Sequence, residues 1–356
     1  MPEVTLEDLG GWPSVLRPLL AGDDLTSTQA GAALAEILEG AASPAQIAAF
    51  IVGLRCKGET VEEMTGLVQA MLGAAESVPL PPGIDPVDTC GTGGAPTRRV
   101  HALNVSTMAA FVIAGAGVPV CKHGGRAASA TSSSADLLEA LGVVIDLGPS
   151  GVARCVTEVG MGFCFAPRFH AAMRHAGPVR RDLGVPTVFN FLGPLANPAG
   201  VRRQVVGVSD LRMAETMLGV LEGKGATRAL VVAGHDGLDE LTTTTTSTVI
   251  ELRDGLTRTY VVDPTELGLA VADPAALAGG SADANVAITN DVLGGATGPH
   301  RDIVVLNAAA GLVAGGLADD LVAGVEAAQS VIDDGRAAGV LERLVSVSRA
   351  AASTPG

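Results

Sequence analysis

The chain has 356 residues, of which 47% are hydrophobic and 17% charged, and its formal net charge is −15. This length exceeds one ordinary core and favours two domains, or one large α/β domain with a helical companion. The apolar content excludes a disordered chain. The acidic balance argues against nucleic acid as a partner, because phosphate binding needs a basic surface.

The N-terminus and the cysteines lead us to expect a cytoplasmic protein without a membrane partner. Met1-Pro2-Glu3-Val4 lacks the basic and apolar regions of a signal peptide, and no apolar run reaches membrane-spanning length. The five cysteines show neither a C-x-x-C pair nor metal-ligand spacing. We interpret them as buried thiols.

Residues 12–75 show helical periodicity without a strand signal. Apolar residues recur at intervals of three and four in the segment 45–54. Thr60-Val61-Glu62-Glu63 has the form of a capping box at the start of another helix. The proline-rich segment 78–83 cannot continue a helix. The pattern predicts a small helical domain, 1–77, followed by a linker.

After the linker, short β-rich runs alternate with helical stretches. The expected strands are 87–90, 118–121, 143–147, 163–166, 204–208 and 229–233. Two further strands, 248–252 and 257–262, are expected to form a hairpin through Arg253-Asp254-Gly255. The alternation predicts a mostly parallel sheet with ligands near the carboxyl ends of its strands.

A glycine-rich segment follows the first expected strand. In Cys90-Gly91-Thr92-Gly93-Gly94, backbone N–H groups can approach a phosphate without obstruction by Cβ atoms. Taken alone, the tetrapeptide fits a tight turn better. Asn104-Val105-Ser106-Thr107 then opens an apolar helix, where hydroxyls and free N–H groups form an anion site and a serine can face a metal.

A basic segment, Lys122-His123-Gly124-Gly125-Arg126, follows another expected strand. Lys122 there would neutralise diphosphate oxygens, and His123 could contact an aromatic acceptor. A solvated basic turn is the alternative. The hydroxyl-rich segment 129–134 comes next, and its hydroxyls either bind phosphate or cap the following helix.

Adjacent carboxylates, Asp239-Glu240, lie just beyond the expected strand 229–233. They suit Mg²⁺, which takes few protein oxygens and shares the rest with water and substrate phosphates. An exposed acidic turn is the alternative. The threonine run 242–246 fits a β-prone loop better than a catalytic feature.

Arginines accompany apolar residues in the segments 161–170 and 178–184. Arginine binds a carboxylate through two parallel hydrogen bonds, although arginines that cap helix ends would show the same pattern. The glycine- and proline-containing segment 189–198 could close an acceptor pocket.

These segments stand in the order found in anthranilate phosphoribosyltransferases, and the chain resembles that family over essentially its whole length. Besides the motifs above, Arg180-Arg181, Phe189-Asn190, Leu192-Gly193-Pro194-Leu195 and Leu306-Asn307-Ala308-Ala309-Ala310 carry the resemblance. It implies a helical domain, 1–77, completed by helices from about 168–195. It also implies a larger α/β domain, 78–356, with a mostly parallel central sheet flanked by helices. A homodimer would form through the helical domain.

The resemblance also implies Mg²⁺-dependent transfer of phosphoribose from phosphoribosyl pyrophosphate to the amine of anthranilate, as in tryptophan biosynthesis. The implied donor-binding residues are Gly91, Thr92, Gly93, Gly94, Asn104, Ser106, Thr107, Lys122 and Ser129. The implied metal ligands are Ser106, Asp239 and Glu240. The implied acceptor-binding residues are His123, Gly125, Pro167, His170, Met173, Arg180, Gly193 and Pro194. Lys122, Arg180, Asp239 and Glu240 would be catalytic.

Four positions depart from the family pattern. Ala95 replaces an aspartate, Gly125 an asparagine and Ala130 a serine, and Met173 stands where close relatives place a tyrosine. The 95–103 loop is also a few residues longer than usual. These departures motivate two alternatives: a phosphoribosyltransferase for another aromatic acceptor, and a non-catalytic relative that binds ligand. Pyrimidine nucleoside phosphorylase chemistry ranks lower, because the Asp-Glu pair belongs to the branch that uses diphosphate.

Overall fold

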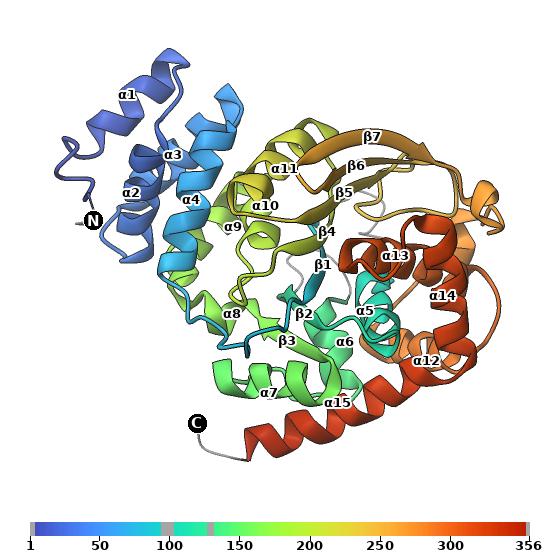
Figure 1. Ribbon diagram of the computed structural model, residues 1–356. Helices are drawn as coiled ribbons and strands as arrows, with labels where there is room; N and C mark the ends of the chain where they lie inside the picture. The colour runs from blue at the N-terminus through green and yellow to red at the C-terminus, as the bar shows by residue number, and fades with distance from the viewer. Residues whose placement is uncertain (1–3, 94–102, 127–131, 354–356) are drawn as a thin grey trace.

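The computed structural model describes residues 4–93, 103–126 and 132–353. Its first four helices form a small domain at one end of the molecule (Figure 1). They are α1 (Pro13–Ala21), α2 (Ser27–Leu38), α3 (Pro44–Lys57) and α4 (Val61–Gly73). The expected capping box is present, with Thr60 accepting from the Glu63 N–H and Glu63 accepting in return.

A seven-stranded sheet forms the centre of the larger domain, in the order β3-β2-β1-β4-β5-β6-β7. The strands are β1 (Val87–Gly91), β2 (Val120–Gly124), β3 (Met161–Phe165), β4 (Arg203–Gly207), β5 (Arg228–Gly234), β6 (Ser247–Arg253) and β7 (Leu256–Val262). β1 to β5 pair in parallel, whereas β6 and β7 add an antiparallel hairpin. The hairpin turns at Asp254 and Gly255, both with positive φ, as predicted.

Helices cover both faces of this sheet and form the C-terminal part of the chain. Those before β4 are α5 (Val105–Gly115), α6 (Ser134–Ala140), α7 (Pro149–Val159), α8 (Ala166–Phe169), η2 (Ala171–His175), α9 (Gly177–Leu183) and α10 (Phe189–Leu195). Those after it are η3 (Leu211–Met213), α11 (Ala214–Gly223), η4 (Pro264–Leu267), η5 (Pro274–Leu277), α12 (Ala282–Leu293), α13 (Pro299–Gly315), α14 (Leu321–Asp333) and α15 (Arg336–Ala352).

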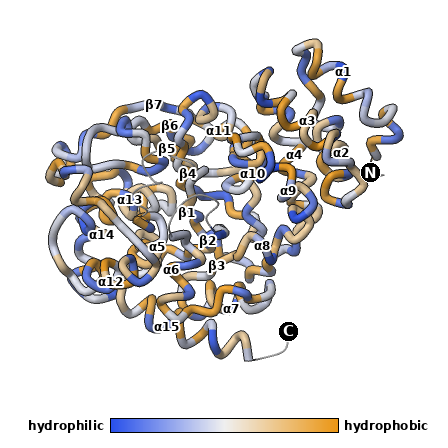
Figure 2. The backbone as a smooth tube through the Cα atoms, turned by 180° about the vertical axis from the view of Figure 1, so that it is seen from behind, coloured by the Kyte–Doolittle hydropathy of each residue, from blue (hydrophilic) through white to orange (hydrophobic). Residues whose placement is uncertain are grey.

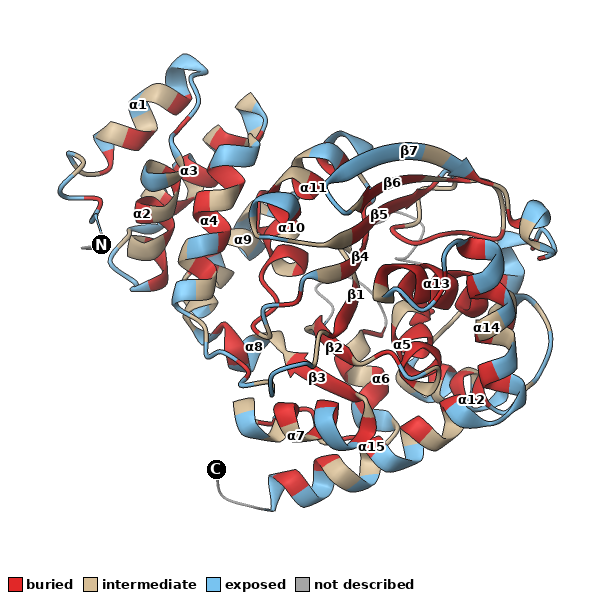
Figure 3. Cartoon of the chain, in the orientation of Figure 1, coloured by how far each residue is buried: buried red, intermediate tan, exposed pale blue. Residues whose placement is uncertain are grey.

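Two hydrophobic cores lie on opposite faces of the sheet. Along β5, Leu230 and Val232 belong to the core shared with α5 and α13, whereas Ala229 and Val231 belong to the core that includes the helical domain. This alternation follows from the two-residue period of a strand. The burial colouring shows β5, β6, α5 and α13 largely covered, while β7 at the sheet edge is exposed (Figure 3). Apolar segments accordingly gather around the strands in Figure 2.

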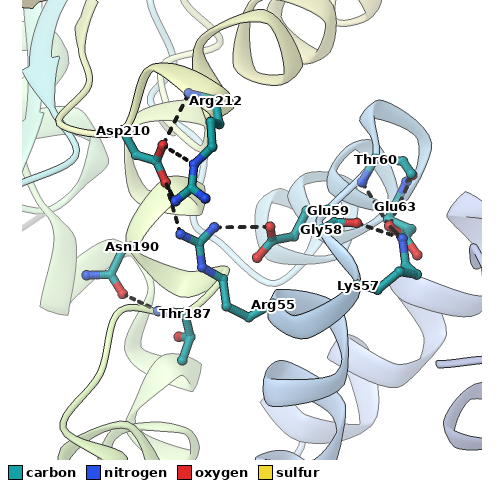
Figure 4. A network of polar contacts seen from close by, with 10 residues as sticks. All are labelled: Arg55, Lys57, Gly58, Glu59, Thr60, Glu63, Thr187, Asn190, Asp210 and Arg212. Atoms are coloured by element: carbon teal, nitrogen blue, oxygen red, sulfur yellow. Dashed lines mark hydrogen bonds and ion pairs between the residues drawn. The ribbon is translucent and has the colours of Figure 1, made fainter. Parts of the chain in front are cut away.

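Polar contacts join the helical domain to the larger domain. Arg55, near the end of α3, pairs with Asp210 beyond β4 at 3.0 Å and with Glu59 at 3.4 Å (Figure 4). Its guanidinium lies 5.5 Å from the ring centroid of Phe191 on α10. The side-chain hydrogen bonds of Asp210, with Arg212 first, lower the pKa of that carboxyl to about 2. The pair is therefore ionised throughout the neutral range.

Three sequence interpretations need correction. Residues 143–147 form no strand: Val143, Ile145 and Leu147 alternate into the core, but the Val144 N–H donates to the Ser348 hydroxyl instead of a neighbouring strand. β2 begins after Pro119, so Lys122 and His123 lie within the strand, not beyond it. Cys56 is exposed and Cys90 half-buried, so only three of the five cysteines are buried thiols.

Candidate functional site

A cavity of about 630 Å³ lies where β1, β2 and β3 end, beside the segment 166–194. It brings together most of the residues singled out in the sequence. They are Gly91, Thr92, Gly93, Asn104, Ser106, Lys122, His123, Gly125, Pro167, His170, Met173, Arg180, Gly193 and Pro194. Their convergence follows from the parallel strands, whose carboxyl ends meet at one edge of the sheet.

Among the described residues, three predicted site residues do not line this cavity: Thr107, Asp239 and Glu240. Gly94 and Ser129 lie outside the described residues, as do Ala95 and Ala130. Thr107 is fully buried, and its hydroxyl donates to Ser134 Oγ at 2.9 Å. Thr107 therefore lies in the first turn of α5 and does not contact the cavity. The other two, Asp239 and Glu240, occupy a small neighbouring cavity of about 10 Å³ with Ser106.

The glycine turn after β1 is shaped by close backbone approach. The Thr92 N–H donates to the Gly207 carbonyl at 2.8 Å, and the Gly93 N–H donates to Asp239 Oδ2 at 2.8 Å. A Cβ atom at Gly91 would lie 2.2 Å from Asp239 Oδ2, so this position admits no side chain without displacing the carboxylate. Gly93 has φ +67°, which glycine adopts without strain.

Lys122 places a cation between the glycine turn and the start of α5. It is 1% exposed, and its Nζ donates to the Thr89 carbonyl and to Ser106 Oγ, the latter at 3.2 Å. Burial raises the pKa of the neighbouring Asp88 carboxyl, while the charge of Lys122 and a hydrogen bond from Asn197 act in the opposite direction. The alternative, a solvated basic turn, is therefore wrong, because the lysine is buried.

Asp239 and Glu240 are likewise buried, at 0% and 5% exposure, which rules out the exposed acidic turn. Asn307 on α13 holds this loop, donating to the Leu241 carbonyl at 2.8 Å and accepting from the Leu241 N–H at 3.0 Å. Asp236 Oδ2 accepts from the hydroxyls of Thr242 and Thr244 at 2.7 and 2.6 Å. The threonine run thus fixes the loop that presents both carboxylates.

The arrangement fits a hard divalent cation. Two carboxylates and the Ser106 hydroxyl meet around the small cavity, and Mg²⁺ characteristically takes one or two protein carboxylates with water and phosphate oxygens. Within the described ranges, no group of three or more His, Cys, Asp or Glu side chains could hold a metal by itself. A cation here would therefore depend on ligands from a bound substrate.

Two histidines form one wall at the other end of the cavity. The rings of His123 and His170 lie 5.1 Å apart, and His123 Nδ1 lies 3.0 Å from the Gly193 carbonyl. Because a carbonyl only accepts, this nitrogen carries the proton. Burial lowers the pKa of His123 to about 3, so the ring is neutral. Its buried Nε2, which has no hydrogen-bond partner within the described residues, is left as an acceptor.

Arg180 faces the same end of the cavity from α9. Its guanidinium lies 5.4 Å from the ring centroid of Phe189, and burial lowers its pKa from the usual value. The ion pairs of the described residues include no carboxylate partner for it. A half-buried guanidinium over an aromatic ring suits a planar anionic ligand. Met173 and Pro167 supply apolar surface nearby.

Several cavity residues escaped the sequence interpretation. Met71 reaches the cavity from α4, and Arg174 and Asn190 line it from η2 and α10. Asn190 Oδ1 accepts from the Thr187 N–H at 3.0 Å, fixing the entry to α10 (Figure 4). Asn190 lies in the segment 189–198, which its sequence associates with the acceptor pocket. No motif near Met71 indicates a contact with the cavity, because Met71 belongs to the helical domain.

Comparisons with known proteins place the chain in a family. Models of the glycosyl transferase family match its helical bundle domain at residues 13–75 and its a/b domain at 84–338. None of the described helices is long and apolar enough to cross a membrane.

Relatives named anthranilate phosphoribosyltransferase match nearly the full length. One from Arthrobacter sp. is 50% identical, covering 95% of this chain and 96% of its own, and one from Acidothermus cellulolyticus is 51% identical, covering 97% of both. The structure from Thermus thermophilus has a TM-score of 0.88 at 40% identity, covering 94% of this chain and 99% of its own. The Saccharomyces cerevisiae enzyme, solved with phosphoribosyl pyrophosphate and Mg, has a TM-score of 0.85 at 27% identity, covering 95% and 98%. The chain belongs to the anthranilate phosphoribosyltransferase family of glycosyl transferases.

Proposed function

We propose that the protein transfers the phosphoribosyl group of phosphoribosyl pyrophosphate to the amine of anthranilate, the reaction named by its relatives and used in tryptophan biosynthesis. The observation that carries the proposal is a single cavity with two unlike ends. The glycine turn and Lys122 stand at one end, beside the small cavity lined by Asp239 and Glu240, and Arg180 over Phe189 stands at the other.

The first end suits the donor. Lys122 would neutralise oxygens of the diphosphate, and the turn Gly91–Gly93 would present its backbone to the phosphoribosyl group. Asp239, Glu240 and Ser106 would hold Mg²⁺, which supplies positive charge to the diphosphate when bound. Asn104 is fixed for this role, since its Oδ1 accepts from Ser132 Oγ at 3.1 Å and from Asn285 Nδ2 at 2.8 Å.

The second end suits anthranilate. The Arg180 guanidinium would bind the carboxylate, and Met173, Pro167 and the histidine pair would enclose the ring. During transfer a bond forms between the amine nitrogen and the anomeric carbon, and the bond from that carbon to the pyrophosphate oxygen breaks. The electron pair of the broken bond leaves with pyrophosphate, and the amine loses one proton to that pyrophosphate or to water. Catalysis then rests on positioning and on charge neutralisation at the leaving group, with no covalent enzyme intermediate.

The proposal includes a cytoplasmic homodimer formed through the helical domain. Leu20 on α1 is 87% exposed, and Val52 on α3 is exposed as well, which supports an apolar contact surface there. Sedimentation equilibrium of the purified protein tests this part. A monomer at micromolar concentration contradicts it.

A different aromatic acceptor is the second candidate. Gly125 and Met173 both line the acceptor end, where the family pattern has an asparagine and close relatives a tyrosine. Loss of two hydrogen-bonding side chains would favour a less polar acceptor. A screen of aromatic amines and acids with the same donor tests this candidate.

Steady-state turnover with phosphoribosyl pyrophosphate, Mg²⁺ and anthranilate tests the main proposal. The turnover is measured as the loss of anthranilate fluorescence. Asp239→Ala with Glu240→Ala is the control. Turnover that disappears in the control supports the proposal. Donor binding by calorimetry without turnover of anthranilate contradicts the acceptor assignment and supports the second candidate if another acceptor reacts.

A further inference from the structure

Four consecutive carbonyls at the end of α10, those of Gly193 to Ala196, each accept a hydrogen bond from a side chain outside that helix. The outer two bonds come from the cavity histidines, with His123 Nδ1 3.0 Å from the Gly193 carbonyl and His170 Nε2 3.0 Å from the Ala196 carbonyl. The last carbonyls of a helix lack partners within it. Here side chains of four different elements supply those partners.

The inner two bonds come from residues that do not line the cavity. Gln204 Nε2 donates to the Pro194 carbonyl, and Lys224 Nζ donates to the Leu195 carbonyl. Gln204 is 2% exposed on β4, and Lys224 follows α11 as its C-cap residue. Neither is among the residues around the cavity. Neither therefore touches a ligand there.

These bonds act together with the packing of Leu192 and Leu195, which are fully buried on either side of Gly193 and Pro194. Gly193 has no side chain, and a Cβ atom built on it would meet nothing within 4 Å. Pro194 lacks an N–H group, so its backbone anchors only through its carbonyl. Yet both residues form the wall beside His123. The wall's position thus depends on the side chains that bind its carbonyls.

The same bonds reach the strand that carries His123. Gln204 Nε2 also lies 3.3 Å from Asp88 Oδ2, which accepts from Asn197 Nδ2 at 2.9 Å. The other oxygen of Asp88 accepts from the His123 N–H at 3.0 Å. A buried polar network with every member bonded holds one geometry, because breaking any bond leaves a buried group without a partner.

We propose that Gln204 and Lys224 are positioning residues for the acceptor pocket, holding the Pro194 and Leu195 carbonyls so that the wall and the two histidines keep one geometry. The inference deepens the proposed function, on which it rests for the identity of the acceptor. It assigns part of acceptor recognition to two residues outside the cavity. The bonds from Gln204 and Lys224 both end at the wall of the acceptor pocket and not at the donor end.

The test compares Gln204→Met and Lys224→Met with the wild type. Each replacement keeps an unbranched side chain and removes one donor. We expect the KM for anthranilate to rise about tenfold in Lys224→Met, as loss of one buried hydrogen bond predicts, and at least as much in Gln204→Met, which also loses the bond to Asp88. The KM for phosphoribosyl pyrophosphate and kcat should change less than about twofold. Lys224→Arg keeps a charged donor and should restore the KM to within about threefold of the wild type.

Ser348→Ala is the matched control. Ser348 is fully buried on α15, accepts from the Val144 N–H at 3.1 Å and donates to the Val345 carbonyl at 3.1 Å, and contributes nothing to the cavity. It should lower thermal stability without separating the two KM values. An unchanged acceptor KM in both methionine variants overturns the proposal, as does an equal rise for donor and acceptor.

Amide hydrogen exchange separates this inference from the proposed function. Exchange in the segment 190–197 should accelerate about tenfold in Lys224→Met and stay unchanged in Ser348→Ala. This readout needs no turnover, so a wild type that ignores anthranilate contradicts the proposed function alone. Unaltered exchange in both methionine variants contradicts the positioning role. Lys224 lies at a helix end and is partly exposed, so its variant tests the inference even if Gln204→Met fails to fold.

Discussion

The two ends of the cavity are built in different ways. At the donor end, ligand-binding groups lie in or next to the turns that follow β1, β2 and β5, and much of the surface is backbone. At the acceptor end, side chains on α9, α10 and η2 form the walls, and residues outside the cavity hold them. The proposed donor site is thus encoded in short motifs, whereas the proposed acceptor site depends on contacts between distant segments.

The largest effect expected from this comparison is at Arg180. Arg180→Gln should raise the KM for anthranilate about 100-fold, because hydrogen bonds to a charged group contribute about 1.5–3 kcal/mol. The donor KM should stay within about twofold. Arg181→Gln, at the exposed neighbouring position, is the control for steady-state kinetics. An unaltered acceptor KM in Arg180→Gln would place the carboxylate elsewhere.

At the donor end, Gly91→Ala should lower kcat/KM at least about tenfold, because small misplacements of catalytic groups are costly. The added Cβ would lie 2.2 Å from Asp239 Oδ2 and must move that carboxylate. Titration of activity with Mg²⁺ should show weaker apparent affinity. Gly73→Ala, where a Cβ meets nothing within 4 Å, is the control. Equal Mg²⁺ dependence in both variants would contradict a metal role for Asp239.

The histidine wall should make stability depend on pH. Burial lowers the pKa of His123 from 6.5 to about 3, so between these values the unfolded chain binds more protons and stability falls as the pH falls. Between pH 7 and 5 the wild type should lose about 2 kcal/mol relative to His123→Gln, at about 1.4 kcal/mol per pH unit below 6.5. Urea unfolding at both pH values measures the difference. Equal losses of stability in the wild type and in His123→Gln would show that the ring is charged in the folded state.

Gly125→Asn should have the smallest effect. A Cβ atom at this position makes ordinary contacts, 3.5 Å from Ala166 Cβ and 3.9 Å from Pro167 Cδ, so folding should be unchanged within about 0.5 kcal/mol. The new amide should lower the acceptor KM about two- to fivefold, the contribution of one neutral hydrogen bond. A higher KM would indicate an acceptor that the glycine accommodates for its size.

Periodicity and punctuation predicted most of the fold. The helical start at 12–75, five of the six strands expected before the hairpin and the hairpin at Asp254-Gly255 follow from local patterns, and the structure confirms them. The prediction of a strand at 143–147 was wrong, because alternate residues are buried wherever an extended chain lies on a core. Whether such a segment joins the sheet is decided by a distant partner, here Ser348.

The candidate site was predictable where chemistry stands in consecutive residues. Lys122, Asp239 and Glu240 were identified from their motifs. Their deep burial was not predicted, because a buried turn and an exposed turn have similar sequences. Gln204 and Lys224 gave no signal. Each acts through a carbonyl of another segment, and backbone acceptors leave no mark in a sequence.

The core beneath the helical domain has a consequence for how the chain unfolds. Apolar residues of α1 to α4 and alternate residues of β4, β5 and β6 belong to one continuous cluster, in which α10 and α11 connect the first helices to one face of the sheet. Separating them would expose apolar residues of α10 and α11 to water. We therefore expect the first helices and the larger domain to unfold in one thermal transition, because the isolated N-terminal helices lack half of their core.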